Sequence, residues 1–266
     1  SEKNIMDENA KMNDVKLRQA IAYAIDTKTA GEKLYNGLYH PATSLIISFF
    51  GDLHDSEVEG YSYDPDKANE LLDEAGYKDV DGDGIREGKD GKEFKITFAA
   101  RKRTEANEAL VQQYIAWWKE VGLNVELYTG RTVEINTFYD AIQANDASID
   151  MYAGGWSTGY DPNPNGLWGE TAPFNMSRFV DEKNTELLDA IGSVASFDEK
   201  TNLKNYKAWQ EYAFEQAFAI PTFESEAITA LNKRVKNFDT NYGSSSENGI
   251  ALENIELTAD KGVAAE

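Results

Sequence analysis

The chain has 266 residues, with 47 acidic and 26 basic side chains and a formal net charge of −21. Such a charge argues against nucleic acid or an anionic membrane surface as a partner, because both bind basic patches. The sequence contains no cysteine, which excludes disulfides, thiolate metal sites and a cysteine nucleophile. Apolar residues make up 41% of the chain, enough for a sizeable core. No apolar run approaches the ~20 residues that span a bilayer.

The first predicted elements are helices. Residues 13–26 form an amphipathic helix for which Asp14 is the expected N-cap. A second helix is expected over residues 27–37. Asp64 precedes a proline and caps a third helix, which Gly76 ends, because glycine readily takes the left-handed conformation that follows a helix.

The middle of the chain alternates between strand and helix patterns. The expected strands lie at residues 94–98, 125–127 and 149–153, and the expected helices at 104–121 and 135–142. This alternation predicts parallel strands joined by right-handed crossovers. The predicted class is therefore α/β, with a mixed sheet of mostly parallel strands flanked by helices. The adjacent Trp117 and Trp118 are expected in the core.

The last third contains two more predicted helices and three short strands. The helices are expected over residues 181–192 and 198–218. The strands are expected at residues 220–223, 228–231 and 252–257. Residues 243–249 form a Ser-rich loop.

An acidic stretch at residues 79–90 matches part of a calcium-binding loop. Three aspartates alternate with other residues, and a glycine follows at the sixth position, where such loops turn sharply. The twelfth position carries an aspartate in place of the usual glutamate. The candidate ligands are Asp79, Asp81, Asp83, Ile85 (through its carbonyl), Glu87 and Asp90. The alternative is an acidic Asp-Gly turn that binds no metal, and any bound calcium would be structural.

A long loop rich in glycine and aromatic residues follows the third predicted strand. It begins where open α/β sheets usually place their ligand crevice, at the carboxyl end of a parallel strand. The candidate ligand-binding residues are Ala153, Gly154, Gly155, Trp156, Ser157, Tyr160, Asp161 and Trp168. The alternative is a surface loop held in place by its own aromatic side chains.

Four segments together resemble the solute-binding proteins, family 5, that deliver oligopeptides to ABC importers. The helix at residues 15–26 resembles a VR-RQAIAYAID segment, and residues 154–162 resemble the loop GW-x-A-D-Y-x-D-P of that family. Residues 63–76 and the tail at 209–238, with its NKRVKNF run, extend the resemblance over most of the chain.

The resemblance implies one lobe of a periplasmic-binding-protein-like clamp. Residues 1–14 are then a lead-in, residues 15–225 the C-terminal ligand-binding lobe, and residues 226–266 a return segment toward an N-terminal lobe outside this chain. In the family the helix segment lies past the middle, so this chain is expected to be the C-terminal portion of a longer receptor. Its targeting signal and any lipid anchor are expected upstream.

The resemblance also implies the function and the partners. Backbone at residues 153–157 is expected to pair with an extended oligopeptide, and ABC transporter permease subunits are the expected protein partners. The location is expected to be extracytoplasmic, at the cell surface or in the periplasm, and the protein monomeric. Gly159 stands where some members carry an aspartate for the peptide's α-amino group, with Asp161 two places later. This departure is typical of members that do not fix the peptide N-terminus.

Two alternatives to a peptide receptor stay open. The same fold can bind another solute, such as a sugar stacking on the loop aromatics. A carboxylate-dependent hydrolase is the enzymatic alternative, but the sequence has only two histidines and none of the common nucleophile, zinc or nucleotide motifs. The sequence therefore predicts no enzyme activity and no required cofactor.

Overall fold

The computed structural model describes residues 4–157, 159–226, 228–238 and 254–262. The chain divides into two units, the first formed by Ser1–Trp156 and Asn163–Glu224, the second by Ser157–Pro162 and Ser225–Glu266. Within the described residues, no helix combines the length and apolarity needed to cross a membrane.

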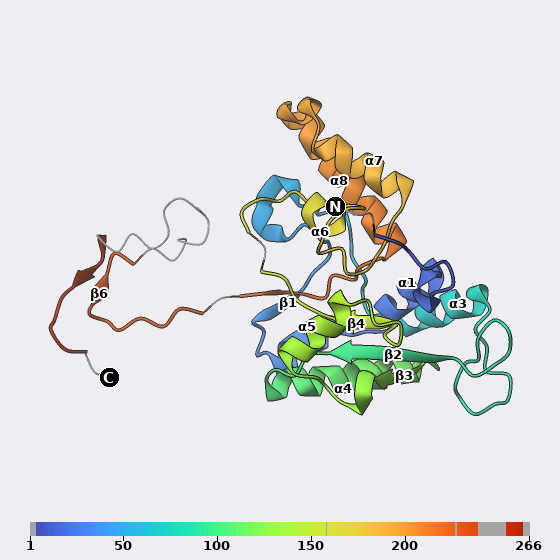
Figure 1. The fold of residues 1–266 in the computed structure, drawn as a ribbon. Helices are drawn as coiled ribbons and strands as arrows, with labels where there is room; N and C mark the ends of the chain where they lie inside the picture. Colours follow the sequence, from blue (N-terminus) through green and yellow to red (C-terminus); the bar gives the residue numbers. More distant parts are fainter. Residues whose placement is uncertain (1–3, 158, 227, 239–253, 263–266) are drawn as a thin grey trace. The chain divides into compact units, whose positions relative to one another are not determined.

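A three-stranded parallel sheet forms the centre of the first unit (Figure 1). Strand β2 (Lys95–Ala100) lies between β3 (Asn124–Leu127) and β4 (Met151–Ala153). Both pairings are parallel. Helix α4 (Glu105–Glu120) connects β2 to β3, and helix α5 (Ile135–Gln143) lies between β3 and β4 in the chain. The predicted α/β class with parallel strands is confirmed.

The two faces of β2 belong to two different cores. Ile96, Phe98 and Ala100 face a large core that includes side chains of α1 (Val15–Tyr23), α3 (Pro65–Ala75) and α4. Ala99 points the other way, into a smaller core that includes two side chains of α5. The sheet is therefore covered on both faces, as parallel sheets require.

The tryptophan pair of α4 lies in the large core, as predicted. Trp117 and Trp118 are 8% and 4% exposed. The Trp118 ring meets Phe98 edge to face, with centroids 5.2 Å apart, and its indole N–H donates to the carbonyl of Ile21 at 3.0 Å. This hydrogen bond satisfies a polar group that burial would otherwise leave without a partner.

Local signals place the starts of α1 and α3 and the end of α3 where the sequence predicts them, whereas α1 ends at Tyr23, three residues earlier than expected. The Asp14 carboxylate accepts from the N–H of Lys16 at 3.0 Å, at the start of α1. The Asp64 carboxylate accepts from the N–H of Lys67 at 2.8 Å, and Gly76 ends α3 in the left-handed conformation at φ 94°. The second predicted helix is α2 (Thr27–Leu34), shorter than expected by one turn at its C-terminal end.

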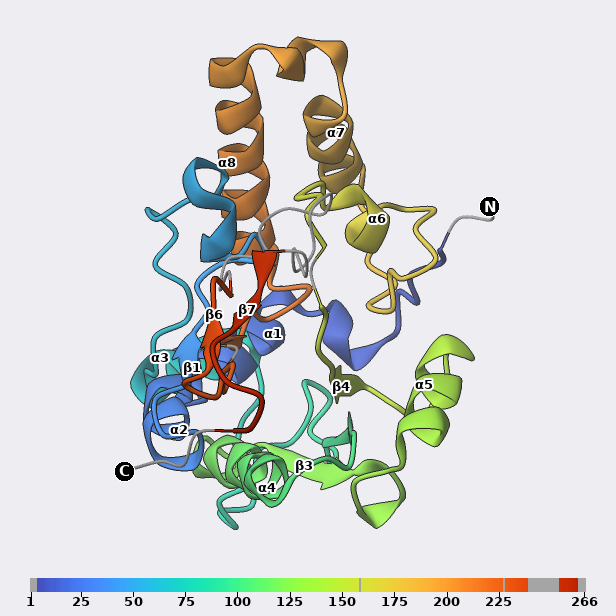
Figure 2. The same ribbon diagram turned by 90° about the vertical axis from the view of Figure 1, so that its left-hand side faces the viewer.

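Three helices of the first unit surround a separate core. These are α6 (Asn165–Trp168), α7 (Glu182–Ile191) and α8 (Glu199–Gln216), and Figures 1 and 2 both show α7 beside α8. Asn184 of α7 is 1% exposed and connects two of the helices. Its side chain accepts from the Trp209 indole N–H at 2.9 Å and donates to the Trp168 carbonyl at 2.9 Å.

Side chains from elsewhere in the first unit bind the last carbonyls of α8. Arg18 donates to the Gln216 carbonyl through Nε at 2.9 Å and through a terminal nitrogen at 2.6 Å. Gln19 donates to the Glu215 carbonyl at 2.8 Å, and the Tyr61 hydroxyl donates to the Phe214 carbonyl. A helix leaves its last carbonyls without intrahelical partners, so these contacts fix the end of α8 against α1.

The remaining elements are short. They are the 3₁₀ helices η1 (Lys11–Asn13), η2 (Ser48–Leu53), η3 (Tyr128–Gly130) and η4 (Val194–Phe197), the paired strands β1 (Tyr39–Pro41) and β5 (Phe223–Ser225), and the antiparallel strands β6 (Val235–Lys236) and β7 (Glu256–Leu257) of the second unit.

Two strand predictions for the tail need correction, and a third prediction lies outside the described residues. The strand expected at residues 220–223 begins only at Phe223, and residues 228–231 form no strand. In that segment Ile228 and Leu231 are 71% and 44% exposed, so their apolar pattern does not reflect burial. The Ser-rich loop at 243–249 lies outside the described residues.

Candidate functional site

The carboxyl edge of the parallel sheet is the candidate ligand site. Strand β4 is the outer strand in the order β3-β2-β4, so its far side has no strand partner among the described residues. The chain continues from Ala153 into Gly154 and Gly155, which are both exposed. An exposed strand edge whose backbone groups are free can accept an extended chain as an additional strand.

Trp156 supplies an apolar surface directly after this edge. Its side chain is 45% exposed, and its ring meets Phe174 edge to face with centroids 5.5 Å apart. Phe174 is itself 47% exposed. Sequence reasoning missed Phe174, because an isolated aromatic residue in a polar loop carries no periodic signal that relates it to a distant strand end.

The other predicted loop residues separate into two groups. Trp168 is 8% exposed and packs against Phe218 at 5.4 Å between ring centroids, in the core of α6, α7 and α8. The structure therefore gives Trp168 a packing position and does not bring it to the exposed edge with Trp156. Ser157, Tyr160 and Asp161 belong to the second unit, where all three are exposed.

The strand that leads to the site contributes a neutral side chain. Burial raises the pKa of Tyr152 to about 12, and the charge of Arg178 only partly opposes this shift. The phenol therefore stays protonated at neutral pH. The edge offers backbone groups and an aromatic surface at this strand, which suits binding without covalent chemistry.

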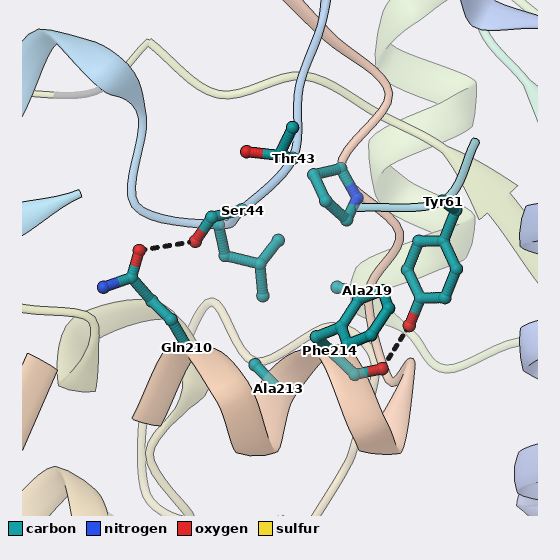
Figure 3. A pocket seen from close by; sticks show the side chains of 9 residues that line it. Thr43, Ser44, Tyr61, Gln210, Ala213, Phe214 and Ala219 are labelled. Carbon is teal, nitrogen blue, oxygen red and sulfur yellow. Dashed lines mark hydrogen bonds between the residues drawn. The ribbon is translucent and has the colours of Figure 1, made fainter. Parts of the chain in front are cut away.

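A small cavity lies elsewhere in the first unit (Figure 3). Its volume is about 10 Å³, room for roughly one water molecule. Two of its polar groups already have protein partners. The Ser44 hydroxyl donates to the Gln210 side-chain oxygen at 2.7 Å, and the Tyr61 hydroxyl donates to the Phe214 carbonyl. We therefore assign this cavity no ligand.

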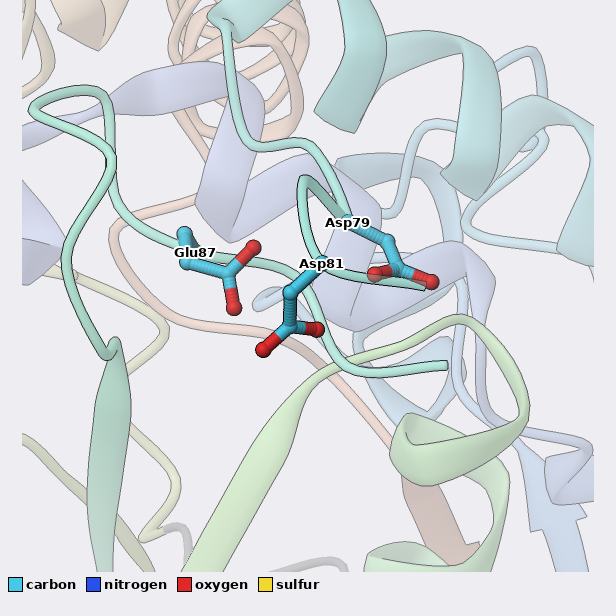
Figure 4. Close-up of side chains that lie close together, drawn as sticks. All are labelled: Asp79, Asp81 and Glu87. Atoms are coloured by element: carbon cyan, nitrogen blue, oxygen red, sulfur yellow. The ribbon is translucent and has the colours of Figure 1, made fainter. Parts of the chain in front are cut away.

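The acidic loop brings together three of its predicted ligands (Figure 4). Carboxylate oxygens of Asp79, Asp81 and Glu87 all lie within 4.8 Å of one another. The loop also turns back on itself, because the Asp79 carboxylate accepts from the N–H groups of Gly82 at 2.7 Å and Gly84 at 2.9 Å. Both glycines have positive φ, which favours glycine at these positions.

Two other predicted carboxylate ligands, Asp83 and Asp90, are not part of this group. The Asp83 carboxylate accepts from the N–H of Ile85 at 2.7 Å. Asp90 pairs with the ammonium group of Lys92 at 3.0 Å, and this hydrogen bond lowers the pKa of the Asp90 carboxyl. The twelfth position is therefore engaged by a neighbouring lysine, and three of the five predicted carboxylate ligands lie together.

Arg86 anchors the acidic loop to the main body of the first unit. Its guanidinium donates to the Val121 carbonyl at 2.9 Å, the Tyr77 carbonyl at 2.7 Å and the Asn69 side-chain oxygen at 2.9 Å. Its backbone N–H donates to the Gly122 carbonyl at 2.7 Å. The loop thus starts beside the end of α3 and is fixed near the end of α4.

The covered parallel sheet, its outer strand β4 and the glycine-tryptophan loop define an α/β domain of the periplasmic-binding-protein class. The sequence model of the bacterial extracellular solute-binding proteins, family 5 (middle region), matches residues 4–178. The chain therefore belongs to the family 5 extracellular solute-binding proteins.

Individual relatives agree with this assignment. The oligopeptide-binding protein OppA of Lactococcus lactis subsp. cremoris is 37% identical over 245 residues, which are 90% of this chain and 40% of that protein. The structure of lactococcal OppA, complexed with an endogenous peptide in the closed conformation, matches with a TM-score of 0.86 and 34% identity. That match covers 96% of this chain and 47% of the OppA chain.

A more distant relative shows the same fold. AppA of Bacillus subtilis, solved in complex with a nonapeptide, matches with a TM-score of 0.78 at 20% identity over 95% of this chain and 49% of its own. The chain thus spans less than half the length of each of these proteins.

Proposed function

We propose that the chain forms part of an extracytoplasmic receptor that captures oligopeptides and delivers them to an ABC transporter. The observation that carries the proposal is the free outer edge of β4, continued by two exposed glycines and the half-exposed Trp156. The relationship to OppA, whose structure holds an endogenous peptide, supports the ligand class. The transporter's permease subunits are the proposed protein partners, and the receptor acts as a monomer without catalysis.

Strand addition explains how one site accepts many peptides. Backbone N–H and C=O groups are common to all peptides, so pairing with residues 153–156 gives affinity independent of sequence. The absence of side chains at Gly154 and Gly155 lets the ligand backbone approach closely. The exposed face of Trp156 then provides apolar contact area for whichever side chain lies above it.

Replacing Trp156 by alanine is expected to weaken peptide binding about tenfold, because a half-exposed aromatic anchor at an interface typically contributes more than 1 kcal/mol. The fold should be unaffected, since the residue lies outside the helices and strands. The change in dissociation constant is measured by isothermal titration calorimetry on the full-length natural protein, with peptides recovered afterwards by mass spectrometry.

The matched control for this variant is Phe197→Ala. Phe197 is 91% exposed in η4, within the connection from α7 to α8, so its loss removes an exposed aromatic ring away from the sheet edge. The control should bind peptide with unchanged affinity. Equal affinity of the Trp156 variant and the control would remove Trp156 from the site, and recovery of cleaved peptides would contradict the non-enzymatic function.

We also propose that the acidic loop holds a structural calcium ion. Three carboxylates within 4.8 Å repel one another unless a cation lies between them, and calcium prefers such oxygen ligands. Asp79, Asp81 and Glu87 would hold the ion, with backbone carbonyls or water completing its coordination. Because Arg86 ties the loop to α3 and α4, the ion would stabilise the fold and take no part in peptide binding.

Calcium at about 100 times its dissociation constant is expected to raise the melting temperature by roughly 5 °C, since binding at this level stabilises by ~2.7 kcal/mol. The Asp81→Ala variant should lose this rise, because it lacks one of the three carboxylates. Differential scanning fluorimetry with calcium or with chelator measures the shift. Asp189→Ala, which removes an exposed carboxylate on α7, should keep the full rise; an equal rise in both variants would exclude the site.

A further inference from the structure

The loop between α6 and α7 carries the second aromatic ring beside the sheet edge. Residues 169–181 connect the two helices, and we call them the α6–α7 loop. Phe174 in this loop meets the Trp156 ring edge to face, with centroids 5.5 Å apart, and both side chains are about half-exposed. An edge-to-face contact is favourable only over a limited range of ring geometries. The position of the α6–α7 loop therefore influences how Trp156 is presented beside β4.

A buried asparagine organises the backbone of the α6–α7 loop. Asn175 is 0% exposed, and its side-chain amide donates to the Gly169 carbonyl at 3.2 Å and to the Phe179 carbonyl at 2.9 Å. Its side-chain oxygen accepts from the Ser177 hydroxyl at 2.9 Å. These bonds close the loop on itself, so the backbone of the adjacent Phe174 is held at a defined place.

Two further contacts attach the loop to α5 and β4. Met176 is 9% exposed and lies in the smaller core, against which Tyr152 of β4 packs. The Arg178 guanidinium donates to the Gln143 carbonyl at 3.1 Å, at the end of α5. Its charge also opposes the rise in the pKa of the Tyr152 phenol. The loop is thus placed against the same strand that leads to Trp156.

Asn4, near the start of the chain, anchors the loop from another direction. Its backbone N–H donates to the Glu170 carbonyl at 2.7 Å, and its side-chain amide donates to the carbonyls of Glu170 at 3.1 Å and Ala172 at 3.0 Å. Its side-chain oxygen accepts from the Arg178 guanidinium at 2.9 Å. One side chain therefore joins the two segments of the loop that lie on either side of Phe174.

The backbone of Arg178 is strained at the point where this network converges. Its φ is 56°, in the left-handed region. Residues other than glycine adopt this region at a cost in free energy, and they keep it where surrounding contacts hold them. The hydrogen bonds to Asn4 and Gln143 are such contacts. Strained residues cluster at binding sites, so the strain connects this network with the site independently of the ring contact.

We infer that Asn4 is a positioning residue of the peptide site. It fixes the α6–α7 loop through Arg178 and the two loop carbonyls, and the loop holds Phe174 against Trp156. The inference rests on the proposed peptide-binding function and adds to it a residue that acts without touching the peptide. A ring pair that is already ordered strengthens binding, because the peptide does not have to order it.

A double-mutant cycle of Asn4→Ala and Phe174→Ala tests this inference on the full-length natural protein. The probe is the peptide that the unsubstituted protein retains best from a library of synthetic nonapeptides, and calorimetry gives the dissociation constants. We expect Asn4→Ala to weaken binding about fivefold when Phe174 is present. In the Phe174→Ala background the same substitution should change the affinity less than about twofold, because residues that act through one another are not additive.

A second readout needs no peptide. The chain has five tryptophans, and fluorine NMR of the protein labelled with 5-fluorotryptophan gives each a signal, with Trp156→Phe identifying that of Trp156. Asn4→Ala should move the Trp156 signal in the same direction as Phe174→Ala does. The signals of Trp117 and Trp118, in the large core, should stay in place. A residue that only stabilises the fold would not move the Trp156 signal of the folded protein.

The matched control is Asn205→Ala on α8. Asn205 is also half-buried, and its side-chain amide donates to the Ala190 carbonyl and to the Ser196 hydroxyl, both at 3.0 Å. The control thus removes the same amide from a different connection, and it should leave the peptide affinity and the Trp156 signal unchanged. If Asn4→Ala fails to fold, Asn4→Asp enters the same cycle, since it keeps the acceptor for Arg178 and loses both amide donations.

The outcomes separate this inference from the proposed function. Unchanged affinity of Asn4→Ala, equal weakening with and without Phe174, or an unmoved Trp156 signal overturns the positioning role and leaves the receptor intact. Equal weakening by the control also overturns it. Failure of every peptide in the library to bind overturns the receptor itself, and the Trp156 signal alone then decides whether Asn4 positions the ring.

Discussion

Replacing Arg18 by alanine is expected to lower the free energy of unfolding by about 3 kcal/mol, because a buried guanidinium and the partly buried carbonyls that it binds would lose their charged hydrogen bonds. Arg18 is 9% exposed. Its guanidinium binds the Gln216 carbonyl at the end of α8 twice and also the Met12 carbonyl at 2.6 Å. Its positive charge lies where the dipole of α8 is negative, which adds to the stabilisation.

Chemical denaturation of the chain, followed by circular dichroism, measures this loss. Lys16→Ala is the matched control on the same helix. The Lys16 side chain forms an ion pair with Glu74 at 3.0 Å in which both partners are largely exposed, so its removal should cost less than about 1 kcal/mol. Equal losses in the two variants would contradict the role assigned to Arg18.

Replacing Asn184 by alanine is expected to destabilise the chain by about 3 kcal/mol, since two buried polar groups lose their partners at ~1–3 kcal/mol each. The Trp209 indole is 0% exposed and donates only to Asn184 among the described residues. The Trp168 carbonyl would lose its 2.9 Å hydrogen bond from the amide. The effect should centre on α6, α7 and α8.

Two measurements test this prediction: denaturation curves give the loss of stability, and amide hydrogen exchange shows which elements lose protection. Amide protection should fall in the three helices first and in the sheet least. The control is Lys183→Ala, at the neighbouring position, which removes an exposed ion pair with Glu186. It should leave the free energy of unfolding within about 0.5 kcal/mol of the unsubstituted chain and the pattern of amide protection unchanged. A loss of protection spread evenly over the sheet and the helices would show that Asn184 does not act locally.

The sequence predicts helices well because their signals are local. Asp14 and Asp64 each cap a helix by accepting from a backbone N–H two or three residues later. Gly76 ends α3 because it adopts a positive φ. The parallel strands follow from the alternation of patterns. The order of the strands cannot be predicted in this way, because the central position of β2 depends on contacts between segments that are distant in the chain.

The candidate site shows where local reasoning fails. Trp156 and Trp168 lie in one loop and look alike in sequence, yet one is 45% exposed and the other 8%. Packing against α7 and α8, which follow later in the chain, buries Trp168. Asp90 also lies elsewhere than its position in the motif predicts. Its carboxylate pairs with Lys92 and is not one of the three carboxylates that lie together in the acidic loop.

The burial of the sheet connects the fold to the proposed function. Burial of both faces of the sheet leaves its edge as the place where backbone groups remain available. Two glycines prolong that edge, and one tryptophan provides apolar contact beside it. Sequence-tolerant peptide capture needs such a combination, with main-chain pairing for affinity and few fixed side-chain contacts for selection.

Native mass spectrometry of the full-length natural protein, incubated with a mixed peptide pool, tests the receptor function with one measurement. The proposed strand addition at β4 predicts complexes with peptides of varied sequence and mass, released intact on activation. A pool of sugars offered in parallel should give none. A protein that retains sugars, or that stays bare in the presence of every peptide, would contradict the peptide-receptor function.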